Sequence, residues 1–444
     1  MTTNATPEHA ESNRAIPIID ADHPRRAEYL RWALELTTLP TATGREGRPA
    51  AWIKEWVEAR PGVAIRTDEH YNIEVFFEGV DPGDPNATPI YFTAHLDHPA
   101  FVVASVGSPT DALLEFRGGV MAPYFEDARV VVHVGERAIA GTLTGKVFDP
   151  KGDTDAGNPG PIPEGERGEA PDGASGVFPV YACELDEPAG ASVGDVATWE
   201  LPDAEVIDDE FGGILHTNAC DDLAAAAAAL AAMEELRLAR EGGAAVGDVR
   251  LLFTRAEEVG FVGAIGACKG GFMPEGSRVI ALETSRSFPH DSPIHGGPIV
   301  RVGDRVSVFT PELTEAVSEV ASKIAGQDST PRATERVSTA TWRWQRKLMA
   351  GGACEASVYC RLGYTSTCVC LPLGNYHNMA DLAAVQAGTN ETRPRVGREY
   401  VGVDDYFGMI DLLAACGLGL PDTPSFAQRV EKLWDERKFV LGER

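Results

Sequence analysis

The sequence lacks the features that mark secreted, membrane-spanning and nucleotide-binding proteins. Its first twenty residues contain no basic start followed by an apolar run, so we expect no signal peptide. No run of about 18 apolar residues is present that could span a membrane. The G-x-x-x-x-G-K-[ST] motif of phosphate-binding loops and the G-x-S-x-G motif of serine hydrolases are both missing. We therefore expect a cytoplasmic protein outside these two enzyme classes.

Positive charge and paired cysteines are also scarce. The chain has 39 basic against 67 acidic residues, a net charge of −28. An acidic surface repels nucleic-acid phosphates and anionic lipid heads, so we expect neither nucleic acid nor membrane as a partner. The eight cysteines are scattered and form no C-x-x-C pair. In a chain of this length without a secretion signal, this spacing favours free, buried thiols.

Strands and helices are predicted to alternate in two separate parts of the chain. The apolar runs Ile90–Ala94, Val249–Thr254, Val279–Leu282 and Thr365–Leu373 are typical of buried strands. Leu223–Arg240 is rich in alanine and predicts a strong helix. This alternation predicts an α/β fold, with a mixed, mostly parallel sheet and helices on both faces.

A different pattern lies between these two parts. Residues 101–214 show short alternating strands separated by turn residues, which predicts an inserted small all-β barrel or sandwich. The predicted domains are therefore a discontinuous α/β domain (24–100 and 215–444), the insertion (101–214) and an N-terminal extension (1–23). Asp149–Ser175, rich in proline, glycine and acidic residues, predicts an exposed loop within the insertion.

Residues able to bind metal or move protons follow the predicted strands. Parallel sheets place ligands beyond the carboxyl ends of their strands. A lone histidine or acidic pair at such a position is more often an ordinary surface residue, so the argument depends on their convergence. The positions are His95, Asp97, Asp221, Glu257, Glu258, Glu283 and His377.

The residue types suit two divalent cations. Imidazole and carboxylate ligands fit zinc, with cobalt or manganese as alternatives. Two ions about 3.5–4 Å apart need one bridging carboxylate, for which Asp221 is the best candidate. His95 and Glu283 would complete one site, and Glu258 and His377 the other.

Two acidic residues are predicted to act without binding metal. Asp97 stands two residues after His95, where it could accept the imidazole N–H and fix the tautomer. Glu257 neighbours Glu258, and adjacent extended residues point in different directions. We therefore predict that Glu257 is the general base for a water between the metals, and later the acid.

The segments around these residues resemble the co-catalytic metallo-aminopeptidase family that includes tetrahedral, deblocking and glutamyl aminopeptidases. The similar segments are TAHLDHPAF (93–101), NACDDLAAA (218–226), TRAEEVGFVGA (254–264), ALETS (281–285) and LGNYHN (373–378). The insertion is also similar to that family's PDZ-like or barrel-like dimerisation domain, through RGGV (117–120), AGTLTGKV (140–147) and SVGDVATW (192–199). The resemblance covers roughly residues 27–416.

The resemblance implies a zinc-peptidase (phosphorylase/hydrolase-like) fold that hydrolyses the N-terminal peptide bond of peptides. It implies the ligand set above, Asp97 as orienter of His95, Glu257 as base and two metal ions per subunit. It also suggests a cis peptide bond between Asp221 and Asp222. Because the family assembles dimers into tetrahedral dodecamers, it implies a homo-oligomer between these sizes. Glu355 is a candidate for holding the substrate's free amine.

Four segments depart from the family pattern. Glu283 stands where the family usually has aspartate, and His98-Pro99 replaces Glu-Ile. Residues 352–355 replace a Gly-Thr-Asp segment, and residues 375–378 replace an Arg-Tyr-x-His-Ser pattern. The ligands survive these changes but the pocket walls differ, so the substrate is less defined than the chemistry.

Two alternatives to an aminopeptidase remain open at this point. One is another amide hydrolase on the same scaffold, such as a deacylase, carboxypeptidase or small-amide hydrolase. The other is a non-enzymatic assembly protein.

Overall fold

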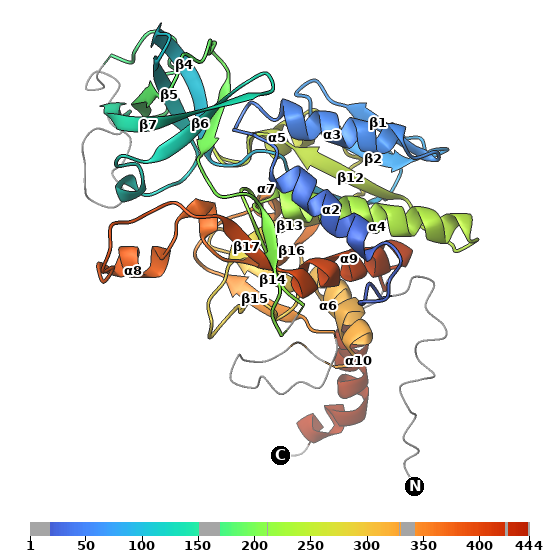
Figure 1. Cartoon of the computed structure of the whole chain (residues 1–444). Helices are drawn as coiled ribbons and strands as arrows, with labels where there is room; N and C mark the ends of the chain where they lie inside the picture. Colours follow the sequence, from blue (N-terminus) through green and yellow to red (C-terminus); the bar gives the residue numbers. More distant parts are fainter. Residues whose placement is uncertain are drawn as a thin grey trace.

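A computed structural model describes residues 18–150, 169–210, 212–327, 329, 342–421 and 425–442 of the chain. Within these residues the chain forms an eight-stranded sheet, a closed barrel and a small three-stranded sheet (Figure 1). Most of the predicted N-terminal extension and of the predicted loop after Asp149 lies outside the described residues.

The large sheet is mixed, as the alternation of strands and helices predicted. Strand β3 lies between β12 and β13 and is parallel to both, and β13 is also parallel to β16. The antiparallel pairs are β1–β2, β2–β12 and β14–β16. In spatial order the strands are β1 (Val63–Thr67), β2 (Ile73–Phe77), β12 (Val249–Thr254), β3 (Ile90–His95), β13 (Arg278–Arg286), β16 (Thr365–Leu373), β14 (Ile299–Asp304) and β15 (Gln345–Met349).

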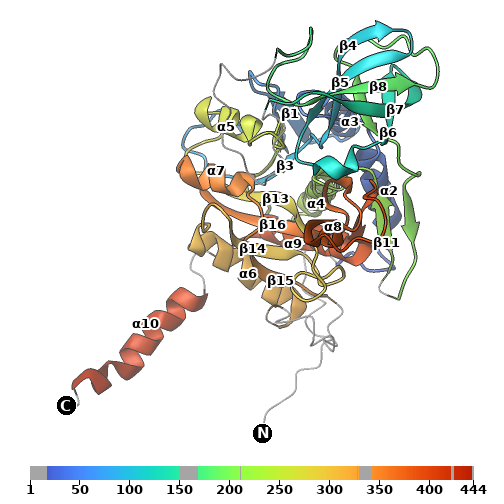
Figure 2. The ribbon, with the colours of Figure 1, turned by 90° about the vertical axis from the view of Figure 1, so that its left-hand side faces the viewer.

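Helices cover both faces of this sheet because its central strands are apolar on both sides. In β13, Ile280 and Leu282 belong to one core cluster and Val279 and Ala281 to another, as the two-residue period of a strand requires. The helices on the first face are α2 (Arg26–Thr37), α3 (Gly47–Glu58), α4 (Leu223–Glu241), α6 (Pro311–Ala325) and α9 (Val403–Leu418). The second face carries α5 (Val262–Lys269) and α7 (Glu355–Arg361), which lie on the opposite side in Figure 2.

Helix α4 is the central helix of the first face. Alanine is the best helix former and its small side chain allows close packing. Every residue from Leu223 to Leu236 is buried, and the helix packs against α2, α9 and β3. The start of α4 is thereby fixed beside the carboxyl end of β3, where the site lies.

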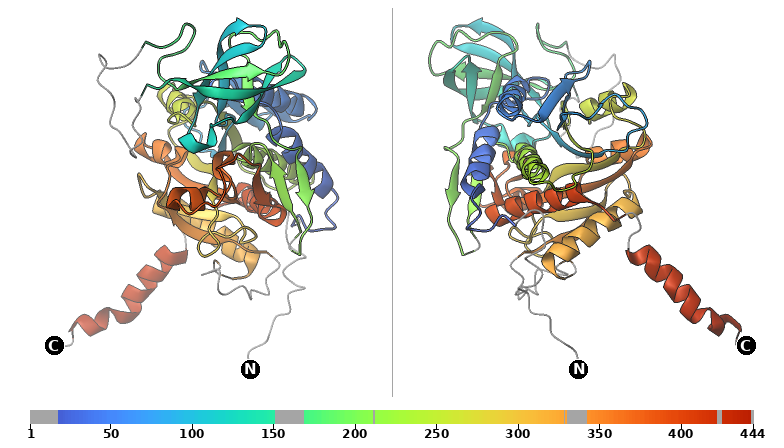
Figure 3. Two further views of the ribbon diagram at one scale, coloured as in Figure 1. Left: turned by 60° about the vertical axis from the view of Figure 1, so that its left-hand side comes forward. Right: turned by 90° about the vertical axis from the view of Figure 1, so that its right-hand side faces the viewer.

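The insertion closes into the predicted barrel. Its strands, in order around the barrel, are β4 (Ala100–Ser108), β5 (Asp111–Arg117), β8 (Val180–Leu185), β7 (Arg137–Phe148), β6 (Arg129–Val134) and β9 (Val196–Trp199). Aromatic rings fill the interior, and Phe125 stacks on Tyr181 with ring centroids 4.5 Å apart. Figure 3 shows this barrel at one end of the molecule.

A third sheet, which the sequence did not predict, connects distant segments. Its strands are β10 (Glu205–Ile207), β11 (Ile214–Thr217) and β17 (Glu399–Gly402). In the antiparallel pair of β11 and β17, Thr217 lies opposite Glu399. The pairing brings the chain before α9 next to the chain before α4.

The remaining described elements are short 3-10 helices and two further α-helices. They are η1 (Ala122–Tyr124), η3 (Tyr376–Asn378), α8 (Leu382–Ala387), α10 (Ser425–Arg437) and η4 (Lys438–Gly442). Helix α10 extends away from the body (Figures 1 and 2). Among the helices that the structure describes, none combines the length and hydropathy needed to cross a membrane.

Candidate metal centre

Five predicted ligands meet at the carboxyl edge of the large sheet. Nε2 of His95 lies 3.4 Å from Oδ1 of Asp221, and Nε2 of His377 lies 3.7 Å from Oδ2 of the same aspartate. His377 Nε2 is also 3.3 Å from Oε1 of Glu258. Asp221 therefore presents one oxygen to each histidine.

Two groups of candidate ligand atoms share Asp221, and a third combines His95 with Glu257 and Glu258. One group holds His95, Asp221 and Glu283, and the other holds Asp221, Glu258 and His377. Within each group all ligand atoms lie within 4.8 Å of one another. The structure thus brings together the five residues that the sequence predicted as ligands.

The strand order explains most of this convergence. His95 is the last residue of β3, and Glu257 and Glu258 follow β12, its parallel neighbour. Glu283 was expected just after a strand, but β13 continues to Arg286, so Glu283 lies within it. The strand is longer than expected because its last residues, although polar, still pair with β16.

Unusual backbone conformations place the remaining ligands. His377 and its neighbours Asn375 and Asn378 have φ values of 54°, 53° and 62°, in the left-handed region that few non-glycine residues adopt. The peptide bond between Asp221 and Asp222 is cis, as the resemblance suggested.

The donor set fits divalent cations. Asp221 Oδ1, Glu258 Oε1 and Glu283 Oε1 are buried, and none has a hydrogen-bond partner within the described ranges. A buried polar atom without a hydrogen-bond partner costs free energy. Three such carboxylate oxygens lie here beside two imidazoles, and a bound cation would give each of them a partner. Carboxylate oxygen and imidazole nitrogen are ligands that zinc and similar ions prefer.

The electrostatics of the site also support the binding of divalent cations. Burial raises the pKa of Glu283 well above its usual value, and the neighbouring Glu257 adds to the effect. Burial and the nearby Glu258 likewise raise the pKa of Glu257. Burial lowers the pKa of His377, but Glu258 and Asp221 outweigh it and raise the pKa to about 9. Without a cation the acidic groups compete for protons, which a bound metal would replace.

Asp97 organises one side of the centre and has no exposed surface. Its carboxylate accepts the backbone N–H of Glu257 at 2.9 Å (Oδ1) and that of Glu258 at 3.2 Å (Oδ2). Thr43 Oγ1 donates to Oδ2 at 2.7 Å. The nearest acceptor for Nδ1 of His95 is the carbonyl oxygen of Asp97 at 3.1 Å, with carboxylate Oδ1 at 3.5 Å. The link from Asp97 to Glu257 and Glu258 was not foreseen.

Glu399, which the sequence analysis missed, organises the other side. Its Oε1 accepts the backbone N–H of His377 at 2.8 Å, and its Oε2 accepts that of Asp221 at 3.0 Å. His98 lies beside it, with Nδ1 2.7 Å from the carbonyl oxygen of Asp221. No short motif connects Glu399 to these residues, because it is 22 and 178 positions away from them.

Glu355, the candidate for amine recognition, begins α7 and is only 2% exposed. Tyr359 donates its hydroxyl to Glu355 Oε2 at 3.2 Å, and Oε1 has no hydrogen-bond partner among the described residues. Burial raises the pKa of Glu355 to about 7. Glu355 belongs to neither ligand group.

An open cavity of about 540 Å³ borders the His377 side. Tyr376 forms part of its wall, and the Tyr376 ring stacks on the ring of His377 with centroids 3.7 Å apart. Arg286, Met379 and Tyr400 also line this cavity. The space is large enough for an amino-acid side chain, and it reaches the centre through Tyr376, since none of the proposed ligands lines it.

Comparison with known proteins identifies the class. A family model described as M42 glutamyl aminopeptidase matches residues 182–390, just under half of the chain. The matched region contains Asp221, Glu257, Glu258, Glu283 and His377. No curated protein matches the chain.

Several solved structures share the fold. A TET aminopeptidase from a marine-sediment archaeon of the Thaumarchaeota has a TM-score of 0.62 at 18% identity, covering 88% of this chain and 96% of its own. An aminopeptidase from the archaeon Desulfurococcus kamchatkensis has a TM-score of 0.60 at 18% identity, with coverage of 91% and 98%. The TET1 peptidase of Pyrococcus horikoshii has a TM-score of 0.61 at 16% identity, with coverage of 88% and 99%.

The fold and the family match together confirm the predicted resemblance to glutamyl and tetrahedral aminopeptidases. The family match over residues 182–390 supports a hydrolase that acts on peptides. A non-enzymatic assembly protein is therefore not supported.

Proposed function

We propose that the protein is an aminopeptidase with two divalent metal ions per subunit, held by His95, Asp221, Glu258, Glu283 and His377. The observation that carries this proposal is the position of Asp221, which faces His95 with one carboxylate oxygen and His377 with the other. A bridging carboxylate with this arrangement suits two neighbouring cations. Zinc is the first candidate, and cobalt and manganese are alternatives.

The remaining residues define the proton transfers. Bound metal ions would polarise the scissile carbonyl and lower the pKa of a water. Glu257 Oε2, 3.8 Å from His95 Nε2, is placed to remove a proton from the attacking water. The same carboxyl group then protonates the departing amine. Asp97 holds the backbone of Glu257 and so fixes the position of this base.

The N-terminal amine of the substrate needs an acidic partner near the centre. We assign this role to Glu355, because its buried Oε1 has no hydrogen-bond partner in the described part of the chain. A Glu355→Gln variant should raise the KM for peptides with a free amine more than it lowers kcat.

The site and the fold also bear on assembly. The TET1 peptidase of Pyrococcus horikoshii can assemble into a tetrahedron or a large octahedral shell. We propose that this chain is also a homo-oligomer, between a dimer and a dodecamer, and that the barrel within the predicted insertion (101–214) serves as its dimerisation domain. Light scattering on the purified protein would give the number of subunits.

Metal removal and a substrate panel test the proposed function. A chelator should abolish hydrolysis of aminoacyl chromogenic substrates, and zinc, cobalt or manganese should restore it. Peptides with an N-acetyl group should be rejected, because the amine can no longer bind an acidic side chain. Preferential cleavage of N-acyl substrates would instead indicate a deacylase or another amide hydrolase on the same scaffold.

A further inference from the structure

We propose that Glu399 is a positioning residue that fixes the separation between Asp221 and His377. It acts through the backbone of these two residues and sets the affinity for the metal ion that would bind between them. This inference rests on the proposed function, because it concerns the ion that Asp221, Glu258 and His377 would share.

The hydrogen bonds of Glu399 connect two separate ligand segments through one carboxylate. Oε1 accepts from the N–H of His377 and Oε2 from the N–H of Asp221, at 2.8 and 3.0 Å. The side chain is fully buried. Burying a carboxylate is costly unless hydrogen bonds compensate, and bonds to a charged acceptor are the stronger kind. Each ligand segment is thus tied to the same rigid group.

Strand pairing fixes Glu399 itself. It is the first residue of β17, which pairs antiparallel with β11 and places Glu399 opposite Thr217. Thr217 is the last residue of β11, shortly before Asp221, and its hydroxyl is 2.8 Å from that of Thr37 in α2. Glu399 therefore belongs to a sheet that is tied to the helical layer, so this anchoring carboxylate does not move freely with either ligand.

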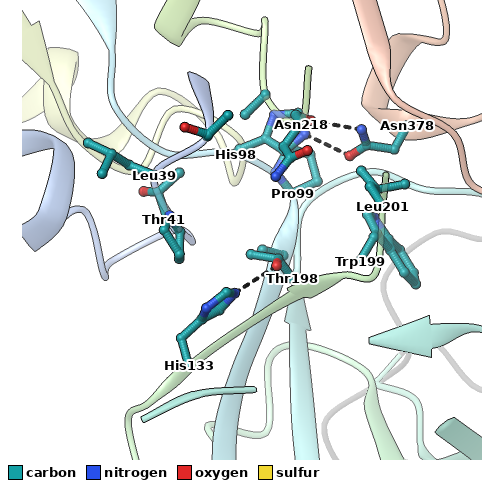
Figure 4. Close-up of a pocket in the computed structure, with 14 residues that line it drawn as sticks. Leu39, Thr41, His98, Pro99, His133, Thr198, Trp199, Leu201, Asn218 and Asn378 are labelled. Atoms are coloured by element: carbon teal, nitrogen blue, oxygen red, sulfur yellow. Dashed lines mark hydrogen bonds between the residues drawn. The ribbon is translucent and has the colours of Figure 1, made fainter. Parts of the chain in front are cut away.

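A second link between the same segments runs through His98 and Asn378. Nδ1 of His98 donates to the carbonyl oxygen of Asp221, and Nε2 lies 2.9 Å from Oδ1 of Asn378 (Figure 4). The Asn378 amide in turn donates to the carbonyl oxygen of Asn218 at 2.8 Å. Since both ring nitrogens of His98 are engaged, His98 supports the centre without being one of its ligands.

The two links hold Asp221 from opposite sides. Glu399 fixes its N–H and His98 fixes its carbonyl, so the Asp221 backbone has little freedom to rotate. Beside His98 lies a small cavity of about 40 Å³, lined by Thr198, Trp199 and Asn218 among others (Figure 4).

The expected consequence is larger at one metal position than at the other. If Glu399 releases one backbone N–H, the 3.7 Å separation of Asp221 Oδ2 and His377 Nε2 is no longer fixed. In the group of His95, Asp221 and Glu283, Asp221 is the one residue that donates its backbone N–H to Glu399, whereas the other group contains both donors, Asp221 and His377. We therefore expect the ion beside His377 to weaken more than the ion beside His95.

The test is a Glu399→Gln variant titrated with cobalt(II) and followed by visible absorption and by metal analysis. Glutamine keeps one acceptor oxygen and turns an amide NH₂ towards the other backbone N–H, so one of the two bonds is lost. The dissociation constant of the ion beside His377 should rise about 10- to 100-fold, the range for residues that orient metal ligands. The absorption band of that ion should shift, because its ligand geometry changes.

Glu205→Gln is the matched control. Glu205 lies in β10 of the same sheet, where it is exposed and pairs with Arg398 rather than with a ligand segment. This variant should keep both dissociation constants and the absorption spectrum of the wild type. If Glu399→Gln does not fold, His98→Gln replaces it and should weaken the same ion.

The outcomes separate the inference from the proposed function. A wild-type protein that binds no second ion contradicts the proposed function itself. A wild type with two ions, together with Glu399→Gln and His98→Gln variants whose dissociation constants and spectra are unchanged, overturns the inference alone. A lower unfolding temperature with unchanged metal binding would likewise show that Glu399 is only structural.

Discussion

Two buried carboxylates, Asp97 and Glu399, lie on opposite sides of the centre, and each anchors the backbone of two site residues. Each accepts the backbone N–H groups of two site residues, Asp97 from Glu257 and Glu258, and Glu399 from Asp221 and His377. Both are fully buried. The difference lies in what they hold, since Asp97 holds the proposed base Glu257 and one proposed ligand, Glu258, whereas Glu399 joins two proposed ligands.

This difference predicts two kinds of failure. Weakening the Asp97 anchor should disturb the proton transfer by Glu257 and so lower kcat even when metal is saturating. Weakening the Glu399 anchor should lower metal affinity first, with activity recovering at high metal concentration. An enzyme that responds identically to both changes would show that the two anchors are not distinct.

The largest effect is expected at the base itself and sets the scale of the comparison. Glu257→Gln removes the group that accepts the proton of water, so kcat should fall by at least about 10²-fold. Metal content should stay that of the wild type, since Glu257 is not a proposed ligand. Steady-state kinetics and metal analysis of one preparation provide both numbers, and full activity would disprove the base assignment.

A smaller loss is expected at the Asp97 anchor. In Asp97→Asn one acceptor oxygen becomes an NH₂ group facing a backbone N–H, so Glu257 or Glu258 loses its bond. At saturating metal, kcat should fall about 10- to 100-fold, as for other residues that orient a metal site. Restoration of wild-type kcat by added metal would place Asp97 in the same category as Glu399.

Thr43 allows a finer test of the same anchor. Thr43→Val keeps the shape of the side chain but removes the hydroxyl that donates to Asp97 Oδ2 at 2.7 Å. A hydrogen bond to a charged group contributes about 1.5–3 kcal/mol, so the unfolding temperature should fall measurably. Because both backbone bonds of Asp97 remain, kcat should change less than in Asp97→Asn, and a larger change would mean that Thr43 itself positions the base.

The smallest expected effect is the coupling free energy between changes at Asp97 and at Glu399. Asp97 and Glu399 share no backbone N–H, so their effects on catalytic efficiency should add in free energy within about 0.5 kcal/mol. A double-mutant cycle with Asp97→Asn and Glu399→Gln measures this term. Coupling well above that value would show that the anchors act as one unit through Asp221.

The two anchors also show how far sequence alone could reach. Asp97 was singled out because it stands two residues after His95, at the end of a recognisable strand. Even so, its bonds to Glu257 and Glu258 were not foreseen, because they depend on the pairing of β3 with β12. Glu399 gave no signal at all, since its strand has four residues and its partners come from distant segments.

The fold was easier to predict than the details of the site. Long apolar strands and the alanine-rich helix at Leu223 have strong local patterns, and so do the short strands of the barrel. The segment around His377 has no such pattern, because its left-handed φ values are imposed by its surroundings. What escaped prediction therefore depends on long-range contacts and not on local propensity.

The central claim is that five side chains from distant segments surround two cations bridged by Asp221. Anomalous diffraction from crystals grown with zinc tests it most directly. We predict two peaks about 3.5–4 Å apart, one beside His95 and Glu283 and one beside Glu258 and His377. Peaks that lie elsewhere, or a single peak that does not contact Asp221, would contradict the account.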